Sequence, residues 1–113
     1  MEYTFRIYRE VYEEMISGRK TIEIRLLNDK TEKIKVGDII RFNVLNSDKY
    51  LLVKVTDKKI YNDVEDLWNN KEILLNSSIY SNKEELTKLL CDIFGEEKVL
   101  NSKIVGIEFI IKK

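Results

Sequence analysis

The chain has 113 residues, the usual size of one domain, and we expect a single domain over residues 1–113. Its composition, 43% hydrophobic and 35% charged, excludes a disordered tail, and no apolar run approaches the roughly 20 residues needed to cross a bilayer. The 20 basic and 20 acidic side chains cancel, which argues against avid, sequence-independent binding to long nucleic acid.

Residue counts narrow the possible chemistry further. Cys91 is the single cysteine, and the absence of histidine removes Ser-His and Cys-His triads as well as imidazole zinc sites. Acid–base chemistry would therefore use Asp, Glu, Lys, Tyr or water, and we expect no metal and no organic cofactor. The N-terminus lacks the pattern of a signal peptide, so we expect a cytoplasmic protein without a membrane partner.

The first part of the chain predicts a strand, a helix and a second strand. Apolar residues recur at helical spacing from Tyr8 to Ile16, and Gly18 ends that helix because glycine readily takes the left-handed conformation. A short strand at 4–7 precedes the helix. The segment 21–26 alternates with period two, which places Ile22, Ile24 and Leu26 on one face and Thr21, Glu23 and Arg25 on the other.

The middle of the chain predicts two strands joined by a turn. The expected elements are a polar loop at 28–35, a turn at 36–38, a strand at 39–45, a turn at 46–49, and a strand from 50 to 56 with a possible extension to 61. Asp38 is expected to fix its turn by bonding nearby backbone, rather than to serve a ligand.

The last part predicts two capped helices and a closing strand. Asn62 and Ser81 are the expected caps, since Glu65 and Glu84 follow each of them three residues later. The second helix carries a leucine-rich stripe that stops at Gly95, and residues 69–80 show no clear pattern. The closing strand runs over 104–111. The order indicates an α+β fold, a small and mostly antiparallel β-barrel with helices packed on it.

The segment Ser17 to Arg25 gathers polar groups where a helix ends and a strand begins. Arg25 could grip a phosphate with two parallel hydrogen bonds, and Lys20 adds a compact positive charge. Glu23 could accept from an amino group such as that of cytosine. The outward face of a one-sided sheet is polar in any case, so Glu23 and Arg25 could equally form a surface ion pair of about 0–1 kcal/mol.

The same segment resembles the ASCH family motif, Gly-x-Lys-x-x-Glu-x-Arg, with Gly18, Lys20, Glu23 and Arg25 at the motif positions. Blocks at 35–42, 94–99 and 104–109 are also similar to family blocks, in the same order. The resemblance implies a PUA-like β-barrel in which the motif residues line a cleft beside the first helix. It further implies RNA binding and, in some members, catalysis on RNA or modified nucleosides.

These implications define the candidate site residues. We expect a ligand, either RNA or a nucleotide-like small molecule, to be bound by Lys20, Thr21, Glu23, Arg25 and Tyr61. Tyr61 could stack a base, although packing is about equally compatible with its position. If the protein is an enzyme, Lys20 and Glu23 are the expected catalytic residues.

Binding and hydrolysis are both open at this point. The chain resembles an acetylcytidine-hydrolysing branch of the family, whose members place a threonine three residues after the motif lysine. This chain has Glu23 there, and its threonine, Thr21, is adjacent to Lys20 instead. Because a carboxylate does not replace a hydroxyl nucleophile, we favour RNA or nucleotide binding. The alternatives are a hydrolase acting on a modified nucleoside, a ribonuclease and, last, a protein-interaction module.

Overall fold

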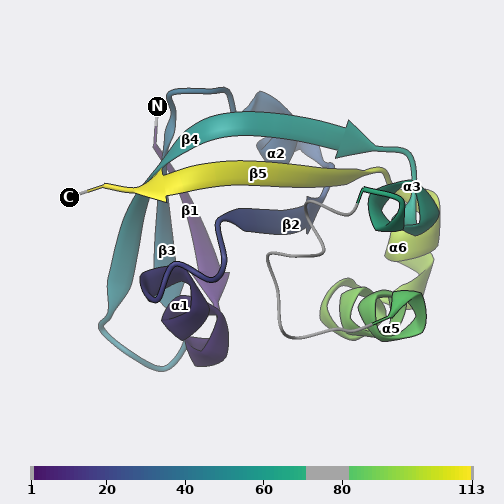
Figure 1. Ribbon diagram of the computed structural model, residues 1–113, viewed down its shortest axis with the longest axis horizontal. Helices are drawn as coiled ribbons and strands as arrows, with labels where there is room; N and C mark the ends of the chain where they lie inside the picture. The colour runs from purple at the N-terminus through teal and green to yellow at the C-terminus, as the bar shows by residue number, and fades with distance from the viewer. Residues whose placement is uncertain (1, 71–81, 113) are drawn as a thin grey trace. The chain divides into compact units, whose positions relative to one another are not determined.

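The structure is a computed structural model and describes residues 2–70 and 82–112. Most of the patternless stretch at 69–80 lies outside these residues. No helix in the described part is long and apolar enough to cross a membrane. The elements follow one another in this order (Figure 1): β1 (Glu2–Ile7), α1 (Arg9–Ile16), β2 (Ile22–Leu26), α2 (Asp29–Lys33), β3 (Ile39–Val44), β4 (Tyr50–Tyr61), α3 (Val64–Trp68), α5 (Lys83–Phe94), α6 (Glu96–Asn101) and β5 (Ile104–Ile111).

Contacts divide the chain into two compact units. The first comprises residues 1–23, 34–58 and 107–113, and the second comprises residues 24–33 and 59–106. The strands form a five-stranded sheet in the order β1-β3-β4-β5-β2, which confirms the expected α+β class. β1 runs parallel to β3, a pairing that the sequence did not indicate, whereas β3 and β4 are antiparallel neighbours.

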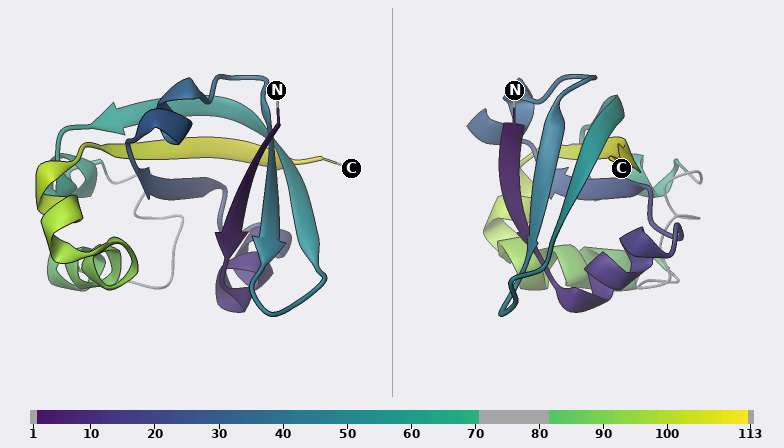
Figure 2. Two further views of the ribbon diagram at one scale, coloured as in Figure 1. Left: turned by 180° about the vertical axis from the view of Figure 1, so that it is seen from behind. Right: turned by 90° about the vertical axis from the view of Figure 1, so that its left-hand side faces the viewer.

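The core of the first unit forms on one face of β1, β3 and β4, which lie side by side (Figure 2, right). Phe5, Phe42 and Leu51 are direct partners across the three strands and are all buried. The Phe42 ring lies 6.3 Å from that of Phe5 and 5.8 Å from that of Phe109 on β5. The strands predicted at 4–7, 39–45 and 50–56 are therefore confirmed, and along them every second side chain enters this core.

The polar segment 28–35 was expected to be a loop, and that prediction is wrong because it contains α2. The Asn28 side-chain oxygen accepts from the backbone N–H groups of Lys30 and Thr31, each at 3.0 Å. In return the Thr31 hydroxyl accepts from Asn28 N at 2.8 Å and donates to the Leu26 carbonyl at 2.9 Å. Thr31 is 1% exposed. A threonine thus closes a capping box in which a glutamate or glutamine is usual.

Both predicted helix caps are one residue too early. Asp63, not Asn62, caps α3 by accepting from Asp66 N at 2.8 Å. Asn82, not Ser81, caps α5 by accepting from Glu85 N at 2.8 Å. Asn and Asp compete closely with Ser at this position, so neighbouring candidates are hard to separate by residue type alone. Gly95 ends α5 with φ 94° as expected, and the short α6 after it was not predicted.

The turn before β3 is held by Asp38, as the sequence predicts. Its side-chain oxygen accepts from Lys35 N at 2.9 Å, and Gly37 takes a positive φ of 95° between them. The backbone hydrogen bond from Lys35 lowers the pKa of the Asp38 carboxyl below its usual value. The ionised form therefore stabilises the fold at neutral pH.

Asp38→Asn is expected to lower stability at pH 7, because it keeps an acceptor oxygen but loses the charge. A depressed folded-state pKa contributes stability above the usual aspartate value of about 3.9, and that contribution is lost as pH falls through the folded value. The difference in unfolding free energy between wild type and variant should therefore shrink below about pH 4. Urea unfolding of the wild type and the variant from pH 2.5 to 7 measures it.

Candidate functional site

The site begins at the junction between α1 and β2 in the first unit. The chain leaves the helix through Gly18, whose φ of 82° confirms the predicted left-handed turn. The carbonyl oxygen of Glu14 accepts from Ser17 Oγ at 2.9 Å, from Arg19 N at 3.0 Å and from Lys20 N at 3.1 Å. These bonds tie the turn to the last helical turn and so fix the backbone that carries Lys20.

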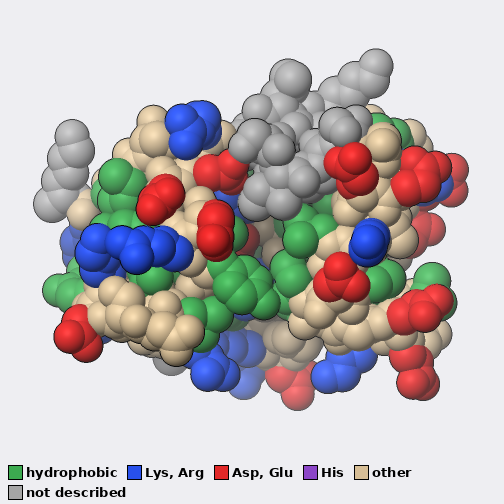
Figure 3. All heavy atoms as spheres, turned by 90° about the horizontal axis from the view of Figure 1, so that it is seen from below, with side chains coloured by type: hydrophobic (Ala, Val, Ile, Leu, Met, Phe, Trp, Pro, Cys, Tyr) green, Lys and Arg blue, Asp and Glu red, His purple; other side chains and the backbone are tan. Residues whose placement is uncertain are grey.

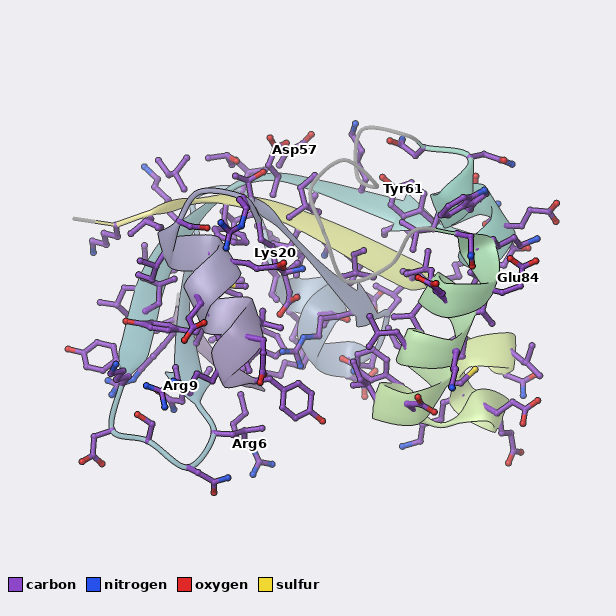
Figure 4. The ribbon with its side chains drawn as sticks, turned by 60° about the horizontal axis from the view of Figure 1, so that its bottom comes forward. Arg6, Arg9, Lys20, Asp57, Tyr61 and Glu84 are labelled. Atoms are coloured by element: carbon purple, nitrogen blue, oxygen red, sulfur yellow. The ribbon has the colours of Figure 1, made fainter. Side chains whose placement is uncertain are left out.

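Lys20 and Glu23 form a buried ion pair. Lys20 Nζ lies 3.5 Å from Glu23 Oε1, and the two side chains are 8% and 9% exposed. Figure 4 shows Lys20 at the junction, whereas the side chains of Arg6 and Arg9 extend outward. Two other ion pairs are open to solvent: Arg9–Glu13 is 70% and 64% exposed, and Lys83–Glu65 is 42% and 70% exposed.

Burial within β2 does not follow the simple alternation expected for a strand with one solvated face. Glu23 is buried, whereas Ile22 and Ile24 are only half-buried. Glu23 is thus not part of an ordinary solvent-facing surface. Withdrawing two charges from water costs several kcal/mol per ion, and a hydrophobic pair of similar volume would commonly be as stable or more so. Stability alone therefore does not account for these two residues.

Thr21 lies between the paired residues and is half-buried. Its backbone carbonyl accepts from Phe109 N at 3.0 Å, which joins the start of β2 to β5 within the first unit. The backbone at residues 20 and 21 is therefore held on both sides, because Lys20 N donates to the Glu14 carbonyl and Phe109 N donates to the Thr21 carbonyl.

Arg25 and Tyr61 belong to the second unit. Arg25 is half-buried in β2, and burial together with the positive charge of Arg25 lowers the pKa of Lys30 in the same unit. Tyr61 is the last residue of β4 and is 6% exposed. The ligand-binding roles expected for Arg25 and Tyr61 stay predictions, while Lys20 and Glu23 are brought together.

Glu14 is a buried charged residue that the sequence reasoning missed. It is 8% exposed, and the buried charged residues of the described part are Glu14, Lys20 and Glu23, all within ten positions of one another. Glu10, Glu13 and Glu14 are all acids of α1. Of these three acids, only Glu14 is directly followed by the fully buried Met15, and this position on the helix distinguishes it from the other two.

Other features of the described surface add little to this candidate site. Basic and acidic side chains are interspersed over the face shown in Figure 3, in keeping with the zero net charge. A hollow of about 350 Å³ is lined by Lys83, Glu84, Thr87 and Lys88 of α5 and contains none of the predicted site residues. Residues 2–70 and 82–112 contain no group of three or more His, Cys, Asp or Glu side chains that could hold a metal ion.

Comparison with known proteins places the chain in a family. The model of the ASCH domain matches residues 6–99, a range that includes the α1–β2 junction and Tyr61, and the chain belongs to this family. None of the curated proteins compared with the chain matches it.

Two solved structures are similar over almost the whole chain. One is the crystal structure of hypothetical protein PH0355, with 30% identity and a TM-score of 0.84, covering 99% of this chain and 100% of that one. The other is the solution NMR structure of protein PF0455 from Pyrococcus furiosus, with 30% identity and a TM-score of 0.76, covering 100% of this chain and 99% of that one. Both support the α+β fold described above.

Proposed function

We propose that this ASCH domain binds RNA or a nucleotide-like ligand through the polar residues at the α1–β2 junction. The buried Lys20–Glu23 pair carries the proposal. Two charges held in a nearly dry environment interact strongly with a ligand group that reaches them, because little water competes. Burying the two charges lowers the stability of the fold, and ligand binding is the reason that we propose for their burial.

The pair offers complementary groups to a nucleobase or phosphate. An ammonium has three donors, and a carboxylate accepts from amino groups such as the exocyclic amine of cytosine. The 3.5 Å separation of Lys20 Nζ and Glu23 Oε1 exceeds the roughly 2.7–2.9 Å of a tight charge-assisted bond. This looser contact favours rearrangement of the pair around a ligand atom.

The other predicted residues extend the same proposal. Thr21 contributes a hydroxyl next to Lys20, Arg25 a planar guanidinium for a phosphate or carboxylate, and Tyr61 a ring for stacking. These three roles rest on residue type and, for Arg25 alone, also on its motif position. Each is tested by its own substitution, Thr21→Val, Arg25→Lys and Tyr61→Leu, in the binding measurement below.

Hydrolysis of a modified nucleoside is a second candidate, because a buried carboxylate lies beside an ammonium. In that reaction Glu23 would act as general base on water, and Lys20 would stabilise the oxyanion that develops on the attacked carbonyl. The missing threonine at position 23 weighs against the acetylcytidine hydrolysis of the related branch.

The double variant Lys20→Met/Glu23→Leu is expected to lose binding of nucleosides, mononucleotides and di- or trinucleotide RNA. It removes both charges of the ion pair together, so neither is left without the other. Isothermal titration calorimetry on a panel of modified and unmodified compounds measures affinity, and chromatography of the same mixtures detects turnover. We expect affinity to fall at least roughly tenfold for the compound that wild type binds best, since a hydrogen bond to a charged group contributes about 1.5–3 kcal/mol.

Lys83→Ala is the matched control, because it removes a lysine from an exposed ion pair. It should leave affinity unchanged. Release of acetate or a cleaved RNA product by wild type, lost in the double variant, would replace binding by hydrolysis as the function. If the double variant stays folded and binds as wild type does, the junction is not the ligand site.

A further inference from the structure

The outward face of β1, β3 and β4 is a second surface, distinct from the α1–β2 junction. Strand pairing aligns its side chains in three rows across the strands, and all of them are exposed or half-buried. We call this the outer face; its rows are Glu2–Ile39–Lys54, Thr4–Arg41–Leu52 and Arg6–Asn43–Tyr50.

The outer face is the reverse of the core of the first unit. The side chains between these rows, such as Phe5, Phe42 and Val53, point the other way and are buried. In Figure 2 (right) β1, β3 and β4 face the viewer, and α1, the helix of the first unit, does not cover them. A sheet face of this extent is open to a partner.

The charge on the outer face differs from that of the whole chain. Its nine side chains include three cations, Arg6, Arg41 and Lys54, and one carboxylate, Glu2. The complete chain has equal numbers of basic and acidic residues. The local excess is therefore positive, which complements an anionic partner.

A rigid planar platform lies within this positive face. The Arg41 guanidinium stacks over the Tyr50 ring at 4.0 Å, and its Nε–H donates to Asn43 Oδ1 at 2.9 Å. Tyr50 is nevertheless 49% exposed. Two planar groups are thus pre-arranged at the surface, and holding them there costs a ligand little ordering entropy.

Among anionic partners, single-stranded nucleic acid best matches a surface on which planar groups lie among cations. Single-stranded nucleic acid presents phosphates together with unstacked bases, which stack on aromatic rings and guanidinium planes. A duplex hides its base faces, and an acidic protein or an anionic membrane presents no nucleobases to stack on the platform. We propose that the outer face binds single-stranded nucleic acid, with Arg41 and Tyr50 stacking bases and Lys54 and Arg6 contacting phosphates. This goes beyond the function proposed above, since none of these residues lies at the α1–β2 junction.

Fluorescence anisotropy with labelled single strands of about 12 nucleotides, within the range of such sites, tests the proposal. Wild type should bind RNA and DNA single strands more tightly than the matching duplexes. Tyr50→Ala and Arg41→Gln should each weaken binding roughly tenfold, and Tyr50→Phe should restore it because the ring remains. With three cations, the logarithm of the association constant should fall with the logarithm of salt concentration with a slope of about −2.

Two controls isolate the surface. Tyr8→Ala removes a tyrosine that is 52% exposed outside the outer face, and Arg9→Gln removes an exposed arginine; both should bind as wild type does. In the Lys20→Met/Glu23→Leu background, Tyr50→Ala should still weaken oligonucleotide binding, so failure of the junction proposal leaves this one standing. The inference would be overturned if Tyr50→Ala binds as wild type does, or if wild type prefers duplexes. It would also be overturned if wild type binds polyglutamate or phosphatidylserine vesicles as tightly as single strands, or binds no single strand at low salt.

Discussion

Replacing Lys20 with alanine is expected to lower the free energy of unfolding by about 3–5 kcal/mol. The Glu23 side chain is 9% exposed and its carboxylate lies 3.5 Å from Lys20 Nζ. Without the ammonium, the Glu23 carboxylate loses this ion pair while it stays in a nearly dry environment. Urea denaturation followed by circular dichroism at pH 7 gives the difference directly.

Two comparisons separate burial from a general lysine effect. Lys83→Ala breaks an ion pair whose side chains are 42% and 70% exposed, so its loss should stay within about 1 kcal/mol. Lys20→Met/Glu23→Leu removes both charges of the ion pair and should recover wild-type stability or exceed it. Equal, small losses in Lys20→Ala and Lys83→Ala would contradict the buried pair.

Phe42→Ala is expected to lower the free energy of unfolding by a similar amount, about 3–5 kcal/mol. Phe42 is 0% exposed, and its ring lies 6.3 Å from Phe5 and 5.8 Å from Phe109. Truncation removes a large apolar side chain and leaves a cavity that the surrounding strands can fill only in part. Thermal and urea unfolding both report the loss.

Phe94→Ala supplies the matched comparison, since Phe94 is only half-buried at the end of α5. Its truncation should cost clearly less than that of Phe42. Phe42→Leu, which keeps most of the volume, should fall between the wild type and Phe42→Ala. The packing described for the first unit would be wrong if both phenylalanines could be truncated at equal cost.

Local patterns predicted much of the fold, and non-local contacts account for most of what was missed. The strands β3 and β4 were predicted from the turn residues that bound them, and the structure shows Ile40, Phe42 and Val44 facing one core. The parallel pairing of β1 with β3 leaves no trace in either strand, since it joins segments more than thirty residues apart. The helix α2 was missed for a local reason, because Thr31 rather than a glutamate closes its cap.

For the candidate site, too, the local pattern predicted some features and missed those that depend on non-local contacts. The motif placed Lys20 and Glu23 within reach of each other, and their ion pair agrees with that spacing. Their burial could not be foreseen, because it depends on contacts such as the bond from Phe109 N to the Thr21 carbonyl, which connects distant parts of the chain. A helical acid such as Glu14 likewise reveals its burial only when the packing around it is known.

The first unit is assembled from three separate segments, and residues near both ends of the sequence belong to it. Phe42 rests against Phe109, and the amide of Lys112 donates to the Leu52 carbonyl at 2.8 Å. During synthesis on the ribosome, the apolar side of β1, β3 and β4 therefore lacks its last layer until residues 107–112 have emerged. A nascent chain that stalls before that point exposes Phe42 and its neighbours. Addition of β5 covers these side chains and so protects the chain from aggregation.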